Sequence, residues 1–183
     1  GDLFRSVGKR YQKIHVKGIS FDSRKIKKRY IFFAIKGNQT SGIKFIRDAI
    51  LKGASAIISE EKIKLKNTKI PLLLVKDVRK SLAEASSNFY KKKPLNIIAV
   101  TGTNGKSSVA DFFYQILSLN KKSAASIGTL GIISKKYNKK TKLTSLDPLV
   151  LHKNLEILYR KKIKNVILEA SSHGLDQNRL DSL

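Results

Sequence analysis

The sequence has 183 residues, 41% of them hydrophobic, which is enough to build one or two small domains with apolar cores. It contains no cysteine, and this excludes both a disulfide framework and a thiolate metal site. No segment approaches the roughly 20 unbroken apolar residues that span a membrane, and residues 1–12 lack the apolar core of a signal peptide. We therefore expect a soluble, cytoplasmic globular protein.

The formal net charge of +25 at pH 7 is of the kind seen in proteins that bind nucleic acid. However, only 8 of the 38 basic residues are arginine, and the lysines are scattered over almost every segment. Proteins that read bases and phosphates favour arginine, because its guanidinium makes two parallel hydrogen bonds. The charge therefore indicates a compositional bias, with polyanion binding as the alternative; in either case it helps to attract an anionic ligand.

The first half of the chain alternates short apolar runs with helical patterns, which predicts an α/β fold. Strands are expected at three apolar runs, residues 31–35, 56–58 and 72–75, the last of them buried. One helix is expected from the apolar stripe of residues 43–50, ending at Gly53. A second helix, capped by Asp77, is expected to bury an apolar face and to end the unit at Tyr90.

The pattern restarts after residues 91–94, where three lysines precede Pro94. A charge run closed by proline is typical of a linker, and a solvated helix end is the alternative interpretation. We place the domain boundary here, so that the two domains are residues 1–93 and 94–183.

The second domain is expected to open with a strand at 97–100 and a helix with apolar residues recurring from Val109 to Leu117. A helix is also expected from Asp147 to about Lys161, because a capping carboxylate followed by proline starts helices well. The remaining expected elements are a strand at 124–127, a basic hairpin-like segment at 135–142, and a buried strand at 166–168 whose end carries Glu169.

Residues 101–108 (TGTNGKSS) form a glycine-lined turn between the first strand and helix of this domain. Glycines let backbone amides point inward, and a helix start offers unpaired amides with the positive end of its dipole. Lys106 is then expected to reach terminal phosphates and Ser107 to coordinate Mg²⁺. The turn departs from G-x-x-x-x-G-K-[ST], because Val100 replaces the first glycine and Gly102 is the one available. An ordinary strand-to-helix turn is the alternative.

This turn resembles the ATP loop of the Mur ligase family, which consists of ATP-dependent amide-forming enzymes. The resemblance implies a small α/β UDP-substrate-binding domain followed by the first part of a P-loop-type, mostly parallel α/β ATPase domain. It also implies ATP and Mg²⁺ as cofactors. In this family ATP phosphorylates a substrate carboxylate, and an amine then displaces phosphate from the acyl phosphate.

Three further stretches are similar to the MurE group of that family. Residues 169–179 (EASSHGLDQNR) resemble its E-x-S-S-H-[AG]-L-x-Q-x-R segment, and residues 144–148 (TSLDP) stand where it has T-T-P-D. Residues 21–24 (FDSR), with 32–37 and Gly42, resemble its uridine-binding domain. The resemblance implies an enzyme that adds a third amino acid, meso-diaminopimelate or lysine, to UDP-N-acetylmuramoyl-L-alanyl-D-glutamate.

The same resemblance implies a set of site residues. Lys106 and Glu169 are expected to be catalytic, and Ser107 and Glu169 to bind Mg²⁺ through oxygen. Nucleotide contacts are expected from Gly102, Thr103, Asn104, Gly105, Lys106, Ser107 and Ser108. UDP-substrate contacts are expected from Phe21, Ser23, Asn38, Gln39, Thr40, Thr144, Ser145, Ser171, Gln177 and Arg179.

Structural alternatives exist for these assignments. Glu169 could be a carboxylate satisfied by a helix N-terminus, and residues 171–179 a capped turn with a surface arginine. His173 is interpreted as part of a structural turn rather than as a catalytic base, and His15 and His152 are assigned no role.

The resemblance also implies more chain than these 183 residues. We expect a fragment that has an incomplete ATP site, a sheet whose edge strand lacks its usual neighbours, and no activity by itself. Expected partners are the UDP-N-acetylmuramoyl-dipeptide and an amino acid, with a monomeric chain, no membrane, and only non-specific contact with nucleic acid. Two other functions stay open: a different ATP-dependent ligase of the superfamily, and a basic nucleotide- or nucleic-acid-binding module without ligase activity.

Overall fold

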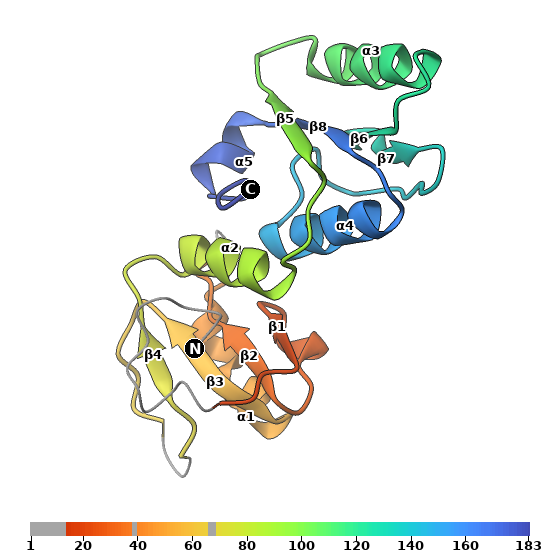
Figure 1. The fold of residues 1–183 in the computed structure, drawn as a ribbon. Helices are drawn as coiled ribbons and strands as arrows, with labels where there is room; N and C mark the ends of the chain where they lie inside the picture. Colours follow the sequence, from red (N-terminus) through yellow and green to blue (C-terminus); the bar gives the residue numbers. More distant parts are fainter. Residues whose placement is uncertain (1–13, 38–39, 66–68) are drawn as a thin grey trace. The chain divides into compact units, whose positions relative to one another are not determined.

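The computed structural model describes residues 14–37, 40–65 and 69–183. The chain divides into two compact units, Gly1–Phe89 and Tyr90–Leu183, each with its own sheet (Figure 1). None of the helices in the described ranges has the length and apolar composition that crossing a bilayer requires. Each unit combines strands and helices in one sheet-based layer structure, which confirms the predicted α/β class.

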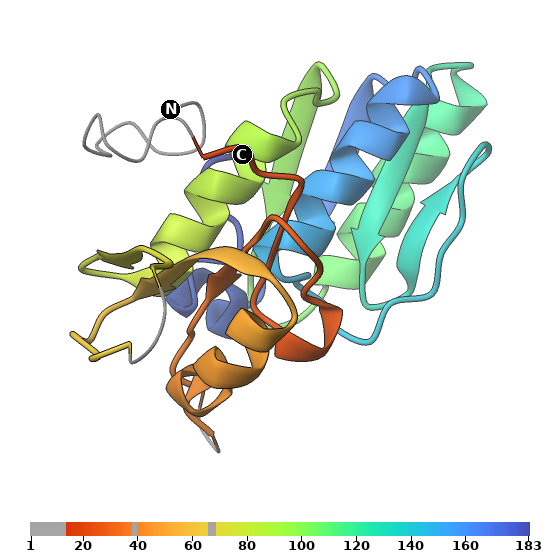
Figure 2. The same cartoon turned by 90° about the horizontal axis from the view of Figure 1, so that it is seen from below.

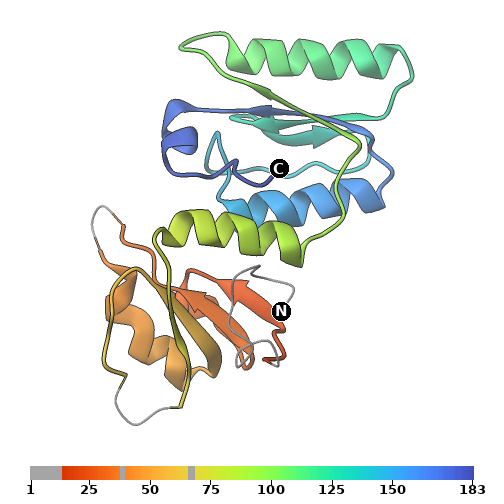
Figure 3. The ribbon, with the colours of Figure 1, turned by 60° about the vertical axis from the view of Figure 1, so that its left-hand side comes forward.

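The first unit is built on a four-stranded parallel sheet with the order β1-β2-β3-β4. Helix α1 (Ile46–Leu51), which follows the 3₁₀ turn η3 (Gly42–Phe45), packs on one face, and α2 (Val78–Phe89) lies on the other (Figure 3). Asp77 caps α2 as predicted, accepting the Lys80 N–H at 2.9 Å. The strands are β1 (Gly18–Ser20), β2 (Tyr30–Phe33), β3 (Ala54–Ser59) and β4 (Leu72–Leu74).

The core of this unit is formed by side chains from the central strands and from α1, and Phe32, Ile57 and Ala49 are fully buried in it. The expectation of a buried strand at 72–75 is wrong. Strand β4 pairs only with β3 at the edge of the sheet, and Leu74 is 53% exposed. An apolar run predicts a strand, but its place in the sheet depends on pairing between distant segments.

The second unit has a four-stranded sheet with the order β5-β8-β6-β7. The first three of these run parallel, and β7 returns antiparallel to β6 as a hairpin. Helices α3 (Lys106–Leu119) and α4 (Pro148–Arg160) cover opposite faces of this sheet (Figures 2 and 3). The strands are β5 (Asn96–Val100), β6 (Ala124–Gly128), β7 (Gly131–Ser134) and β8 (Asn165–Glu169).

Helix α4 forms the well-packed side of this unit. Its residues Leu151, Leu155 and Leu158 are buried against β6 and β8. Asp147 caps it by accepting the Val150 N–H at 3.0 Å, as predicted. Its neighbour across the sheet behaves differently: of the described residues of α3 only Ala110 is buried, and the predicted apolar stripe is largely exposed.

The topology brings three strand ends to one edge of this sheet. Strand β5 ends at Val100, beside Glu169 at the end of β8, and Gly128 ends β6 on the other side of β8. In open parallel α/β sheets, ligands bind outside the carboxyl ends of the strands. The predicted phosphate loop follows β5 directly and therefore lies at this edge.

Candidate functional site

The loop that joins β5 to α3 has the geometry of an anion cradle. Gly105 caps α3 with φ +79°, in the left-handed region that glycine adopts without penalty. The ammonium of Lys106, the first helical residue, donates to the carbonyls of Gly102 at 2.6 Å and Thr103 at 3.3 Å. The lysine therefore folds back over its own loop, where the helix start offers its positive end to an anion.

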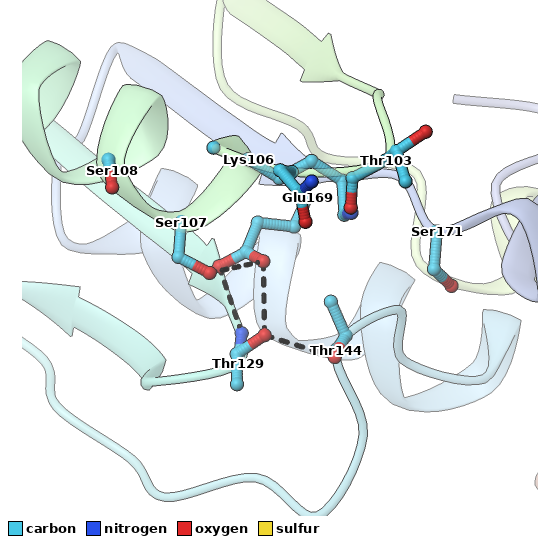
Figure 4. A pocket seen from close by; sticks show the side chains of 10 residues that line it. Thr103, Lys106, Ser107, Ser108, Thr129, Thr144, Glu169 and Ser171 are labelled. Carbon is cyan, nitrogen blue, oxygen red and sulfur yellow. Dashed lines mark hydrogen bonds between the residues drawn. The ribbon is translucent and has the colours of Figure 1, made fainter.

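Glu169 lies at the centre of the site and is only 3% exposed. Its carboxylate accepts three hydrogen bonds: from the Ser107 hydroxyl at 2.9 Å, and from the Thr129 backbone N–H and hydroxyl, both at 3.0 Å (Figure 4). Gly128 runs so close to this carboxylate that a Cβ at position 128 would overlap Glu169 Oε1. Buried charge needs such partners, so the carboxylate is held in one orientation.

A pocket of about 330 Å³ opens in front of Glu169, near the lower end of the size range of ligand sites. The structure thus brings the predicted nucleotide loop together with two predicted substrate contacts, Thr144 and Ser171. The described residues that line the pocket are Thr103, Asn104, Gly105, Lys106, Ser107, Ser108, Thr129, Thr144, Glu169 and Ser171.

Ser145 joins the loop before α4 to the end of β8. It is 2% exposed, and its hydroxyl donates to the Glu169 carbonyl at 3.0 Å and accepts the Ser171 N–H at 2.9 Å. The hydroxyl of Ser171 lies 3.0 Å from that of Ser145 and caps the short helix α5 (Ser172–Asp176) by accepting the Gly174 N–H. The Ser145 hydroxyl is thus engaged within the protein in this structure.

Gln177 and Arg179 do not line the pocket but reach it through Ser145. The Arg179 guanidinium donates to the Ser145 carbonyl at 2.9 Å and, through Nε and Nη2, to Gln177 Oε1 at 3.1 and 2.7 Å. The Gln177 amide in turn lies 2.8 Å from His173 Nε2. Residues 171–179 therefore form one connected polar turn at the side of the pocket.

The D-S-R stretch of the first unit forms a local structure of its own. Asp22 caps the 3₁₀ turn η2 (Ser23–Lys25), and both of its oxygens accept from the Arg24 guanidinium, at 2.9 and 3.0 Å. These hydrogen bonds from Arg24 lower the pKa of Asp22. Ser23 is buried, while Phe21 is partly exposed beside it.

Three more predicted contacts of the first unit lie together in the sequence. Thr40 is exposed, and its carbonyl accepts the Gly37 N–H at 3.0 Å. Asn38 and Gln39 lie outside the described residues. All five predicted contacts of this unit stay predictions.

The oxygen atoms of the pocket fit Mg²⁺. Ser107 Oγ and Glu169 Oε2 are 2.9 Å apart, and neighbouring oxygens around an octahedral Mg²⁺ with bonds of 2.0–2.1 Å are also separated by about 2.9 Å. Within the described ranges there is no group of three or more His, Cys, Asp or Glu side chains that could hold a metal. One carboxylate and one hydroxyl, completed by water and phosphate oxygens, is a usual Mg²⁺ environment.

Thr129 is the pocket residue that the sequence interpretation missed. It lies in the tight turn between β6 and β7, and it contacts Glu169 across 40 positions of sequence. The available signal was its position in the sequence, because its hydroxyl lies two residues after the strand expected at 124–127, as Glu169 lies one residue after the strand expected at 166–168. Residues in those places meet only if the two strands are neighbours, as β6 and β8 are.

Comparison with known proteins gives the family. Residues 15–90 match the model described as "Mur ligase family, catalytic domain", and residues 100–183 match the "Mur ligase middle domain". The chain is 47% identical over 174 residues to the UDP-N-acetylmuramoyl-L-alanyl-D-glutamate--2,6-diaminopimelate ligase of Rickettsia montanensis, covering 93% of this chain and 36% of the relative. The ligase of the same name from Bradyrhizobium diazoefficiens is 40% identical over 170 residues. The chain thus spans about a third of the length of these relatives.

Solved structures agree with this assignment. A structure of UDP-N-acetylmuramoyl-L-alanyl-D-glutamate--2,6-diaminopimelate ligase superposes with a TM-score of 0.78 at 34% identity, covering 92% of this chain and 34% of that one. The MurF ligase of Thermotoga maritima, solved in complex with ADP, shares the fold with a TM-score of 0.58 at 24% identity, over 88% of this chain and 33% of that one. With both of its units matched by models of one family, the chain belongs to the Mur ligase family.

Proposed function

We propose that this chain forms the UDP-substrate-binding and phosphate-binding part of an ATP-dependent ligase of peptidoglycan precursor synthesis. The reaction is the addition of 2,6-diaminopimelate, the amino acid named for the relatives, to UDP-N-acetylmuramoyl-L-alanyl-D-glutamate. The observation that carries the proposal is the Ser107–Glu169 oxygen pair beside Lys106, in one pocket at the carboxyl ends of parallel strands. Such a pair suits the Mg²⁺ that accompanies a nucleoside triphosphate, because one carboxylate and one hydroxyl leave room for water and phosphate oxygens.

The residues of the pocket divide the work. When bound, ATP supplies a phosphoryl group to the substrate carboxylate with release of ADP, and the amine then attacks the carbonyl carbon as phosphate leaves. The Lys106 ammonium leaves its loop carbonyls and neutralises charge on the terminal phosphates. Ser107 and Glu169 would hold Mg²⁺, which would supply positive charge beside the phosphoryl group that is transferred. The loop amides around Gly105 cradle the remaining phosphates.

The sugar-peptide is held from the other side of the pocket. The side chains of Thr144 and Ser171 line that side of the pocket. The Arg179 guanidinium lies next to them, where it donates to the Ser145 carbonyl. On this proposal residues 1–93 form the UDP-binding domain and 94–183 part of the ATP-binding domain. The substrate contacts of the first unit are Phe21, Ser23, Asn38, Gln39 and Thr40, on the uridine diphosphate. Ser145 and Gln177 belong to the contacts with the sugar-peptide. The enzyme acts as a monomer in the cytoplasm, where ATP and the UDP-linked substrate are both available. It binds nucleic acid only non-specifically.

A binding experiment tests the division between domains. The chain is titrated calorimetrically with UDP-N-acetylmuramoyl-L-alanyl-D-glutamate and, separately, with ATP and Mg²⁺. We expect the UDP-substrate to bind more tightly, because its domain is matched over nearly its whole length. Tighter binding of ATP would contradict the domain assignment.

An activity experiment tests the reaction. The chain replaces the matching third of the Rickettsia montanensis relative, and phosphate release is followed with each substrate omitted in turn. We expect release only when ATP, the UDP-dipeptide and 2,6-diaminopimelate are all present. If lysine supported phosphate release at the same rate as 2,6-diaminopimelate, the proposed amino acid would be wrong. Phosphate release in the absence of the UDP-dipeptide would overturn the proposed function.

A further inference from the structure

Thr129 connects the two ends of the pocket. Its backbone N–H donates to Glu169 Oε1 and its hydroxyl to Glu169 Oε2, so one residue holds both carboxylate oxygens. The same hydroxyl lies 3.0 Å from the hydroxyl of Thr144, which is expected to contact the sugar-peptide. Figure 4 shows the hydrogen bonds that join Thr129 to Glu169 and to Thr144.

The chemistry of these groups fixes the direction of the hydrogen bonds. A carboxylate only accepts, and a threonine hydroxyl has one proton to donate. Because Thr129 donates its proton to Glu169, the proton between the two threonines comes from Thr144. Thr144 then offers a ligand only its oxygen lone pairs, which accept an N–H or O–H group.

Ser171 is ordered in the same way. The Ser145 hydroxyl donates its proton to the Glu169 carbonyl, so the proton between Ser145 and Ser171 comes from Ser171. Ser171 also accepts the Gly174 N–H, which leaves it one lone pair and no proton for a ligand. Both hydroxyls on this side of the pocket are therefore acceptors, opposite the donors of the phosphate loop.

We propose that Thr129 is a positioning residue that fixes the magnesium-binding carboxylate and, through Thr144, the hydrogen-bond polarity of the substrate side. The inference rests on the proposed function. A carboxylate has about four lone-pair sites. Thr129 uses one of these sites on each oxygen, so each oxygen keeps one further site, and on Oε2 that site accepts the Ser107 hydroxyl in this structure. The contacts from Thr129 can thus persist while Mg²⁺ binds, and they hold Glu169 in the binding orientation.

The test is the magnesium dependence of nucleotide binding, measured by calorimetry with ATP over a series of Mg²⁺ concentrations. Thr129→Val keeps the side-chain shape and the backbone N–H but removes the hydroxyl. We expect the half-saturating Mg²⁺ concentration to rise about 10- to 100-fold, the usual effect of losing a partner of a metal ligand. Affinity for UDP-N-acetylmuramoyl-L-alanyl-D-glutamate without Mg²⁺ should also fall, by roughly 3- to 10-fold. Thr129→Ser restores the hydroxyl and should recover most of both.

Two further variants make the result decisive. Thr141→Val is the matched control, because the Thr141 hydroxyl donates to the backbone carbonyls of Gly128 and Leu143 and not to Glu169. This variant should behave like the unaltered chain. Gly128→Ala leaves Thr129 intact but pushes the Glu169 carboxylate from the other side, and it should reproduce the loss of magnesium response.

The outcomes separate the two proposals. A magnesium dependence of Thr129→Val within about twofold of the unaltered chain, or no difference between Thr129→Val and Thr129→Ser, would overturn the inference and leave the proposed function standing. Nucleotide binding by the unaltered chain that ignores Mg²⁺ would overturn the proposed function and the inference with it. Thermal unfolding of each variant shows that its fold is retained.

Discussion

At the scale of single residues, the clearest prediction concerns Lys106 and the rate of the reaction. Its ammonium donates to two carbonyls of its own loop. A phosphate bound in the loop can replace these carbonyls as the acceptor while the side chain stays over the loop. In the chimeric ligase, Lys106→Ala should reduce the rate by at least about 100-fold, as expected for the loss of a charged donor aimed at the charge of the transition state. Affinity for the UDP-dipeptide should hardly change. Rates come from phosphate release and affinity from calorimetry.

The matched control is Lys122→Ala, which removes an exposed lysine of the same unit away from the pocket. It should leave both measurements unchanged. If Lys106→Ala also kept its rate, residues 101–108 would be an ordinary turn and the proposed ligase function would fail.

Residues differ in how much the sequence says about them. The phosphate loop could be predicted because its glycines, lysine and hydroxyl are consecutive, and the helix that they start is local. The role of Glu169 was implied by the resemblance of residues 169–179, and its place at the end of an apolar run agrees with it. Thr129 could not be predicted, because its role exists only through a contact with Glu169 that strand order creates. The substrate contact predicted at Ser145 stays a prediction, and the hydrogen bond that its hydroxyl accepts from the Ser171 N–H, 26 positions away, could not be predicted from the sequence.

At the scale of elements, the start of α4 is the most testable feature. The Asp147 carboxylate accepts the Val150 N–H at 3.0 Å, and Pro148 begins the helix. Asp147→Ala should lower the stability of α4 by about 1 kcal/mol, the usual value of such a cap. The reason is that one unpaired amide of the first turn loses its acceptor.

Hydrogen exchange of the α4 amides measures this loss in the element itself. Asp147→Asn keeps an acceptor oxygen and is expected to exchange almost as slowly as the unaltered chain. Equal acceleration in both variants would show that the negative charge, and not the capping hydrogen bond, stabilises the helix start.

Helices and strands were predictable as elements, but their packing was not. The period-3.6 pattern identified α2 and α3, and the caps located the starts of α2 and α4. Burial was harder, because it depends on what covers an element. Leu74 lies on an edge strand, and Phe112 lies on an uncovered side of α3. An apolar pattern describes one partner of a contact and says nothing of the other.

At the scale of the whole molecule, the alternation of strands and helices was sufficient to predict an α/β chain, and the family resemblance implied the mostly parallel sheet of the second domain. The order β5-β8-β6-β7 was not predictable, since β8 enters between strands that precede it in the chain. The same placement puts Glu169 between the phosphate loop and Thr129. The long-range pairing that sequence periodicity does not encode therefore assembles the site.

The stability of the molecule should depend on pH through His152. This side chain is fully buried on α4, and neither ring nitrogen has a hydrogen-bond partner among the described residues. Burial lowers the pKa of His152 to about 4, and the nearby charge of Lys93 lowers it further, while the backbone at Asp181 opposes the shift slightly without reaching hydrogen-bond geometry. An unfolded histidine has a pKa of about 6.5, so between these values the unfolded chain binds the proton and the folded chain does not.

The free energy of unfolding should therefore fall as the pH drops from about 6.5 to 4, by at most roughly 3 kcal/mol from this group. Urea unfolding at several pH values measures it. His152→Leu removes the titrating group and should flatten the curve in that window. His15→Gln, a change at an exposed histidine, should keep the slope of the unaltered chain. If the free energy of unfolding of His152→Leu still fell over this pH range, groups other than His152 would be responsible for the acid sensitivity, and the prediction would be wrong.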